Sequence, residues 1–431
     1  MSPDVLRAGL LVEARLGRPP QDALEAAVVL EAWAGVPAQQ ALETARALMS
    51  GQPAAPATSR AAPVAPSRPP RQLLEGFSFV VAVAAIALWA APLAAVLGAG
   101  VVRDALILAL PVTLGLQWGM VARHLGRPSG LAGLAEQRNT LALTAAALLF
   151  AAAVLGLTGA LAALLIVTWT AGTVVIRRGW AVAYCAVVAG AVPAMLLGIP
   201  APALVAGVAA VTAALAWWAL ATVPTAASRP GRWSRTLAAG LTGVGLGVLL
   251  VSDPTVDWAD GAAPALALLP SALGALWAGR HLWSLAGAFP RALAGFPACA
   301  ARDAVPRSVA LGPARVLAGA AWRLTALTAV GSVALLPWLG TDLTGVLVGY
   351  GLIALATMLI GIMDALGRPS LGVAAVAASV ACALAVRALD PAVAGAVLAC
   401  GGAVAVLLLL PAALVLLARP ARTLATSVWI T

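Results

Sequence analysis

The sequence contains no lysine, only two histidines and few charged residues of any kind. Charged side chains make up 10% of its 431 residues, and hydrophobic ones make up 62%. A typical soluble domain has about 25% charged and about 45–50% apolar residues. A single soluble core cannot bury such an apolar excess, so we predict that the chain lies in a lipid bilayer. The four cysteines are scattered, without the spacing of a metal site or a disulfide framework.

Long apolar runs separated by short polar breaks follow one another from Phe77 onward. Each run is about 18–22 residues long, which is enough for a membrane-spanning helix. The sequence therefore predicts an all-α polytopic membrane protein with about 12 transmembrane helices. We place the spans at residues 77–98, 104–122, 140–156, 158–176, 180–198, 202–222, 236–251, 262–279, 318–338, 343–363, 371–386 and 392–417.

The arginines give these spans an orientation. If the N-terminus is cytoplasmic, 17 of the 19 arginines after residue 75 fall on the inner side, and only Arg103 and Arg387 fall outside. Cytoplasmic loops are the ones that carry the excess of basic residues. We therefore predict a multi-pass protein of the inner (plasma) membrane with both termini cytoplasmic. The net charge of +10 is interpreted as a topology signal and not as a nucleic-acid-binding surface.

Residues 1–50 are polar and acidic, without the apolar run of a secretory signal. The stretch from Gly17 to Glu25 recurs from Gly35 to Glu43, and each copy places glycine at a helix end and proline at the next helix start. We predict three helices, at 4–16, 20–34 and 38–49, which form a small cytoplasmic helical cap. The cap either docks to a cytoplasmic protein partner or has no defined partner. Residues 51–75 are a Pro/Ala-rich linker.

A longer repeat lies among the spans. The second span carries Pro111-x-x-Leu-Gly-x-x-Trp118, and the eighth carries Pro270-x-x-Leu-Gly-x-x-Trp277. Each motif is soon followed by Arg-His-Leu, which contains the only histidines of the chain. We predict two six-helix repeats, the lobes 76–228 and 229–431, related by an axis along the membrane normal. Transporters with this symmetry bind substrate between their lobes.

The centres of the spans contain no Asp, Glu, Arg or His. A proton relay or sodium site made of buried carboxylates therefore has no obvious residues. The span hydroxyls are expected to bond back to their own helix or to join neighbours, and Gln117 is the best candidate for lining a cavity. The paired Arg-His sequences either bind a phosphate or pyrophosphate or satisfy helix ends and lipid phosphates. The predicted substrate-binding residues are Gln117, Trp118, Trp277, Arg123, His124, Arg280 and His281.

One outer loop holds three acids, Asp253, Asp257 and Asp260. Carboxylates in such a loop are candidate ligands of a divalent cation, but the loop is short, and we interpret it as solvated. We also expect Arg103 and Arg387 to pair with neighbouring acids at the surface. No metal site, cofactor or catalytic residue is predicted, and the chain is not expected to be an enzyme.

The second half of the spans has four recognisable features. They are a basic stretch from Phe289 to Arg315, Trp322-Arg323, Tyr350, and the turn from Asp364 to Pro369 with its Ala-Leu-Gly-Arg sequence. Together they resemble the multidrug/oligosaccharidyl-lipid/polysaccharide exporter superfamily. The resemblance covers residues 77–420 and implies a two-lobed flippase that moves lipid-linked glycans or exports amphiphiles by alternating access. Membrane lipids are the implied partners.

Three alternatives remain open at this stage. Gly119-x3-Arg123-His-x-Gly-Arg127 resembles in spacing a loop motif of the major facilitator superfamily, although Arg123 stands where that motif has Asp. A polyprenyl-phosphate-dependent membrane glycosyltransferase would use the acids of the outer loops. A non-transporting membrane scaffold would act through its N-terminal helical cap.

Overall fold

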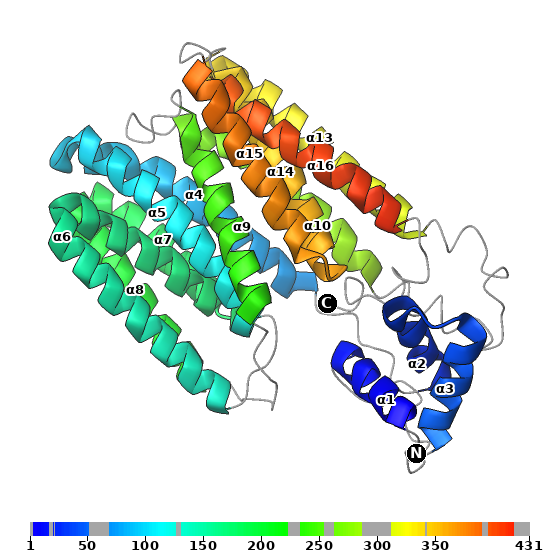
Figure 1. Cartoon of the computed structure of the whole chain (residues 1–431). Helices are drawn as coiled ribbons and strands as arrows, with labels where there is room; N and C mark the ends of the chain where they lie inside the picture. Colours follow the sequence, from blue (N-terminus) through cyan, green and yellow to red (C-terminus); the bar gives the residue numbers. More distant parts are fainter. Residues whose placement is uncertain are drawn as a thin grey trace.

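The computed structural model describes residues 3–16, 20, 22–50, 69–125, 131–222, 233–253, 263–286, 312–340, 343–389 and 395–417. Within these ranges the chain is helical and has no β-strand. A small group of helices made by the first 50 residues lies at one end of a larger group of long helices (Figure 1).

The cap consists of α1 (Pro3–Leu16), α2 (Ala23–Val29) with its π-helical continuation η1 (Leu30–Ala34), and α3 (Ala38–Ser50). The three predicted helices are therefore present. Asp22 accepts a hydrogen bond from the backbone N–H of Glu25 at 2.7 Å and so caps α2. Gly35 ends the second helix with a φ of 68°, a left-handed conformation that favours glycine. The cap has a core of its own, which includes Val12, Ala26, Val29, Leu30, Ala41 and Ala45.

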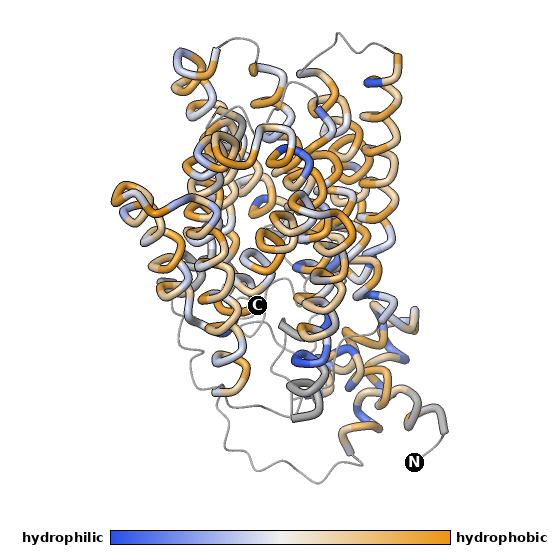
Figure 2. Tube along the Cα trace, turned by 90° about the vertical axis from the view of Figure 1, so that its left-hand side faces the viewer, coloured by the Kyte–Doolittle hydropathy of each residue, from blue (hydrophilic) through white to orange (hydrophobic). Residues whose placement is uncertain are grey.

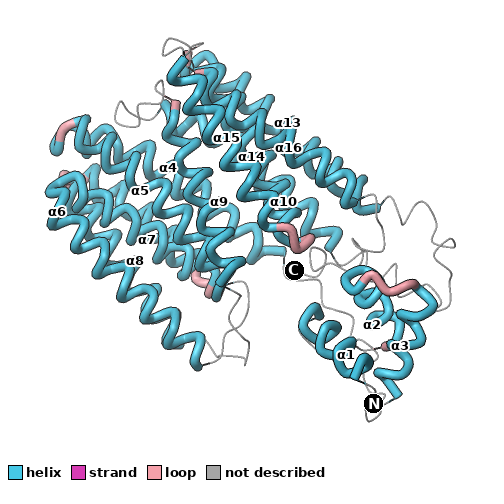
Figure 3. Tube along the Cα trace, in the orientation of Figure 1, coloured by secondary structure: helices cyan, strands magenta, loops and turns pink. Residues whose placement is uncertain are grey.

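Each predicted span falls on one of the long helices, whose ends are joined by short turns in several places (Figure 3). Among the described residues, nine helices are long and apolar enough to cross a membrane, and Ala181–Leu196 is a shorter apolar helix. The chain is therefore a helical, membrane-embedded protein. The helices are α4 (Pro69–Leu97), α5 (Ala99–Met120) with η2 (Val121–Leu125), α6 (Leu131–Arg177), α7 (Ala181–Leu196), α8 (Ala201–Thr222), α9 (Trp233–Ser252), α10 (Ala263–Ala286), α13 (Gly312–Leu339), α14 (Thr344–Ala365), α15 (Pro369–Leu389) and α16 (Ala396–Leu417).

Two helix boundaries differ from the sequence-based prediction. Helix α4 already begins at Pro69, inside the predicted linker, because two successive prolines suit a first helical turn. The third and fourth predicted spans are both in α6, and the chain reverses between them at Gly156 alone, with φ 62° and ψ −137°. This backbone conformation is open to glycine and costly for other residues.

The surface of the long helices suits a bilayer. Hydrophobic residues line most of their length (Figure 2). Large exposed aromatic residues occur near helix ends, where membrane proteins place tryptophan at the lipid–water interface. They include Trp217, Trp218, Trp233 and Trp338.

The long helices form two groups, α4–α8 and α9 with α10 and α13–α16, and α9 lies on the side of the second group that faces the first (Figure 1). Contacts between the groups are made by α4 with α10 and by α5 with α9. Within the groups, α4 packs on α7, α6 on α8, α9 on α15, and α14 on α16. We call the end at which α14 ends and α15 begins the cap end, and the end at which α15 ends and α16 begins the far end.

Glycines allow the closest of these contacts. A Cβ atom on Gly243 of α9 would collide with the carbonyl of Leu114 in α5, and one on Gly247 would collide with the backbone of Pro111. Such small residues let helix backbones approach each other in a membrane. The predicted motif Pro111-x-x-Leu-Gly115 is therefore part of a tight helix–helix joint.

The cap contacts the long helices through Trp33. Its indole ring lies over Gly367, where a Cβ would be 2.9 Å from the ring. The guanidinium of Arg15 lies over the same indole, 3.9 Å from its ring centroid, in the geometry of a cation–π interaction. The cap is thus docked at the turn between α14 and α15.

Candidate functional site

Gln117, the predicted cavity residue, joins two helices. Its Nε2 donates a hydrogen bond of 3.0 Å to the backbone carbonyl of Trp169 in the second half of α6. The same carbonyl accepts a hydrogen bond from the hydroxyl of Thr173 at 3.0 Å. Trp118, the next residue, is half-buried and packs against the hydrophobic core. In this conformation the amide nitrogen of Gln117 is committed to holding α5 against α6.

Arg123 lies at the cap end of α5, in the π-helical turn η2. Its guanidinium stacks over the indole of Trp233 at 4.1 Å from the ring centroid. Trp233 is the first residue of α9 and is 60% exposed. Arg123, which follows α5 in the chain, therefore contacts the first residue of α9 across the joint between these two helices. The side chain of His124 lies outside the described part of the structure.

A second set of predicted residues, Trp277, Arg280 and His281, lies at the cap end of α10. Arg323 of α13 donates from Nη1 to the carbonyl of Gly319 at 2.9 Å and lies 5.8 Å from the ring centroid of Trp277. His281 packs beside Gly319, where a Cβ would be 2.7 Å from its Nε2. Arg280 is exposed. Sequence reasoning missed Arg323 as a member of this cluster, because the residue comes from another helix.

His281 lies beyond the apolar span predicted at 262–279. Burial, together with the positive charge of Arg323, lowers the pKa of His281 below its usual value. Both effects disfavour the imidazolium form. At neutral pH the positive charge of this cluster therefore comes from the arginines, and His281 offers a neutral imidazole.

The candidate residues thus form two separate groups of neighbours. Arg123 has its stacking partner on α9, whereas Trp277 and His281 lie against α13. The structure places both groups at the cap end, on the side to which most arginines are assigned. The arrangement offers guanidinium groups and indole faces, which can bind an anionic headgroup and the apolar body next to it.

Sequence reasoning was wrong about Asp253. This residue is buried, with 2% of its surface exposed, and does not lie in a solvated loop. Its carboxylate accepts hydrogen bonds from the backbone N–H groups of Gly395 at 3.1 Å and Leu398 at 3.2 Å, at the start of α16. A carboxylate at a helix N-terminus satisfies free donors and the helix dipole. Asp257 and Asp260 lie outside the described residues.

The two arginines at the far end, Arg103 and Arg387, also differ from each other. Arg103 lies beside Asp104 at 3.6 Å, and both side chains are more than half exposed. Arg387 donates to the carbonyl of Ser252 at 3.2 Å, so it binds the end of α9. The expected acid neighbour, Asp390, is not among the described residues.

Two polar pairs at the cap end were not predicted. Arg235 of α9 and Asp364 of α14 form a bidentate ion pair with distances of 3.0 and 2.6 Å. Arg178 donates to the Oε1 of the buried Gln137 at 2.7 Å, which joins the two ends of α6. The predicted topology places these residues at the same end of the spans, but nothing in the sequence indicates which of them form pairs.

Most hydroxyls of the spans behave as predicted. Several donate to a carbonyl three or four residues earlier in the same helix, namely Thr168, Thr173, Thr212, Ser271, Thr325 and Thr357. Thr170, Thr328 and Tyr350 have buried hydroxyl oxygens with no hydrogen-bond partner among the residues that the structure describes. Within the described ranges no group of three or more His, Cys, Asp or Glu side chains is placed to hold a metal ion.

Comparison of the chain with models of known families, with curated proteins and with solved structures yields no match.

Proposed function

We propose that this chain is an integral membrane transporter or flippase that moves a lipid-linked glycan or another amphiphile by alternating access. The proposal includes twelve transmembrane helices in two six-helix lobes, 76–228 and 229–431. It also includes the orientation at the inner (plasma) membrane, with both termini and the cap in the cytoplasm. The resemblance to the exporter superfamily is part of this proposal.

The observation that carries the proposal is the reciprocity of the helix contacts. The first helix of each lobe packs against the second helix of the other, since α4 meets α10 and α9 meets α5. The first and fifth helices of each lobe also pack together, as α4 with α7 and α9 with α15. A two-fold axis along the membrane normal produces such reciprocal pairs, and transporters of this symmetry work by movement of one half against the other.

The chemistry of the spans favours an amphiphile over a bare ion. The predicted span centres contain no charged residue, so a desolvated anion would find no charged partner there, whereas an apolar tail needs none. In the proposal, Gln117, Trp118 and Trp277 contact the amphiphile, and a phosphate is drawn to the cap end by Arg123, His124, Arg280 and His281. Arginines at this hydrated end can form charge-assisted hydrogen bonds without full burial.

The test is a flipping assay in reconstituted vesicles. A fluorescent polyprenyl-pyrophosphate sugar serves as the probe, and a membrane-impermeant quencher reports the fraction in each leaflet. We expect the wild-type chain to accelerate flipping, and the double variant Arg123→Gln with Arg280→Gln to lose most of that acceleration. The matched double variant Arg103→Gln with Arg387→Gln removes the same charge from the far end and should have a much smaller effect.

Two results would overturn the proposal. If the far-end pair were the more damaging, the assignment of the phosphate site would be wrong. If the wild-type chain did not accelerate flipping of this probe or of a fluorescent phospholipid, the proposed transport function would be wrong. A membrane scaffold that acts through the cap would then be favoured. The contact of Trp33 with Gly367 is the observation that supports this second function.

A further inference from the structure

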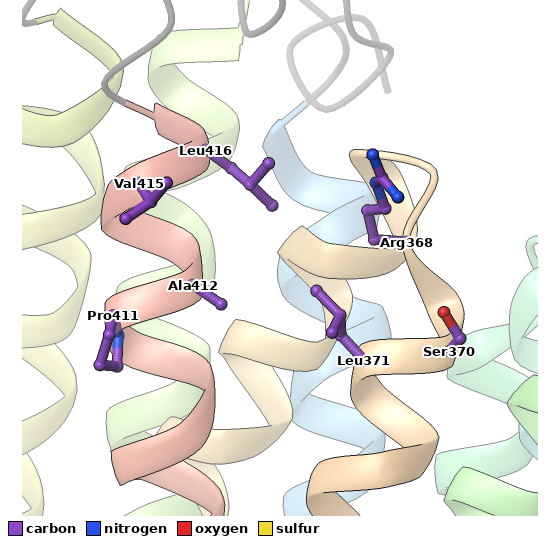
Figure 4. A pocket seen from close by; sticks show the side chains of 7 residues that line it. All are labelled: Arg368, Ser370, Leu371, Pro411, Ala412, Val415 and Leu416. Atoms are coloured by element: carbon purple, nitrogen blue, oxygen red, sulfur yellow. The ribbon is translucent and has the colours of Figure 1, made fainter.

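A slot of about 380 Å³ separates α15 from α16 at their cap ends (Figure 4). One wall is formed by Leu371 of α15 and the other by Ala412 and Leu416 of α16, and these side chains point toward one another. Pro411 and Val415 complete the apolar lining. The remaining lining residues, Arg368 and Ser370, lie at the end of the slot where α15 begins.

The slot exists because the two helices touch closely only toward the far end. A Cβ on Gly401 of α16 would lie 3.2 Å from the carbonyl oxygen of Ser379 and 3.3 Å from the Cβ of Ala383, both in α15. Toward the cap end the side chains of α15 and α16 no longer fill the space between them. Val415 remains 60% exposed, so this side of the slot opens toward the surrounding bilayer.

The polar end of the slot carries an available positive charge. Arg368 is exposed, and within the described part of the chain its guanidinium has no acidic partner. The acid nearest in sequence, Asp364, is already held by two hydrogen bonds from Arg235. Arg368 also precedes the start of α15 at Pro369, where the helix dipole favours an anion. The hydroxyl of Ser370 adds a hydrogen-bond donor at the same end.

We infer that this slot binds one anionic phospholipid of the leaflet at the cap end. An acyl chain occupies the apolar slot between α15 and α16, and the lipid phosphate binds Arg368 and Ser370. Basic residues at the cytoplasmic ends of membrane helices recognise anionic headgroups in this way, and the apolar walls select a lipid over a free phosphate. The inference is independent of transport, because the slot lies between two helices of one group.

The experiment measures lipid retention by the full-length protein in a zwitterionic detergent by native mass spectrometry. Phosphatidylglycerol and phosphatidylcholine are titrated separately. We expect one molecule of phosphatidylglycerol to be retained in preference to phosphatidylcholine. Arg368→Gln should weaken this retention about fivefold, since one basic residue near a headgroup contributes about 1 kcal/mol. Arg103→Gln, which removes an exposed arginine at the far end, is the matched control and should change nothing.

A second variant tests the slot independently of charge. Ala412→Trp places a large side chain on the wall that faces Leu371, and it should abolish the preferential retention of phosphatidylglycerol while the thermal midpoint stays that of the wild type. Ala412→Leu serves the same purpose if the tryptophan variant unfolds. Inorganic phosphate should not displace the lipid, and displacement would indicate a simple anion site. Equal retention of both lipids, equal effects of the two arginine variants, or unchanged retention after filling the slot would each overturn the inference.

Discussion

Helices α5 and α10 carry the same Pro-x-x-Leu-Gly-x-x-Trp pattern, yet the structure uses it in two different joints. In α5, Pro111 and Gly115 face α9, and Gly247 and Gly243 meet them there. In α10, the motif faces α13, where a Cβ on Gly274 would lie 2.7 Å from the Leu324 carbonyl oxygen. The first joint links the two groups of helices, and the second is internal to one group.

The difference shows that the repeated motif provides a packing surface and does not fix its neighbours. Proline and glycine leave a shallow, smooth strip on a helix, onto which another backbone can pack closely. The tryptophans reflect the same divergence, because Trp118 packs against the core whereas Trp277 is 45% exposed. The reciprocal pairing of α4 with α10 and of α5 with α9 therefore holds for whole helices without residue-by-residue equivalence.

The largest effect is expected from Gly243→Ala in the joint between the groups. The new methyl group would collide with the backbone of Leu114, and backbone cannot move aside as a side chain can. We expect the free energy of unfolding to fall by about 3 kcal/mol, the upper range for overpacking, as measured by denaturant unfolding in detergent. The control is Gly190→Ala in α7, where a Cβ meets no atom within 4 Å. Equal stability of the two variants would contradict the tight joint.

Gly274→Ala tests the joint within the second group. Its methyl group would meet the Leu324 carbonyl oxygen and the Thr328 hydroxyl, each at 2.7 Å. Because one of these atoms belongs to a side chain that can rotate, we expect a smaller loss of about 2 kcal/mol. Gly361→Ala in α14 is the matched control, with open space around the new Cβ. A larger loss for Gly274→Ala than for Gly243→Ala would reverse the ranking of the two joints.

Asp253→Ala tests the far end of α9, where the chain closes onto α16. Removing the carboxylate leaves the N–H groups of Gly395 and Leu398 without their acceptor. We expect a loss of about 1–2 kcal/mol, typical of a helix N-cap, in the same unfolding measurement. Asp104→Ala, which removes an exposed acid, should leave stability nearly unchanged. Equal stability losses for Asp253→Ala and Asp104→Ala would indicate that Asp253 is a solvated loop residue, as the sequence suggested.

The smallest effect is expected at the cap end of α9, from the ion pair of Arg235 with Asp364. Their side chains are 41% and 33% exposed, so water screens much of the attraction. A double-mutant cycle with Arg235→Gln and Asp364→Asn should give a coupling free energy below about 1 kcal/mol. If this coupling free energy exceeded the loss of unfolding free energy measured for Asp253→Ala, then α9 would be held mainly at its cap end.

The sequence predicted the helices well and their contacts poorly, for a physical reason. Apolar runs and helix-ending glycines are local signals, so the long apolar helices and the three cap helices were predicted from hydropathy and from the glycines and prolines of the short repeat alone. Gln117 donates a hydrogen bond to a carbonyl 52 residues away, and the residue types alone do not indicate such a distant partner. Asp253 was misjudged because its burial depends on α16, whose first residues come more than 140 positions later.

The contact of Trp33 with Gly367 has a consequence for biosynthesis. The two residues are 334 positions apart in the sequence, and chains grow at about 5–20 residues per second, so Gly367 is made roughly 17–67 s after Trp33. The cap has its own core and can fold early, but its docking turn does not exist until most of the helices have been synthesised. Docking of Trp33 can therefore occur only after the turn between α14 and α15 has been made, and it distinguishes a chain that contains this turn from one truncated before it.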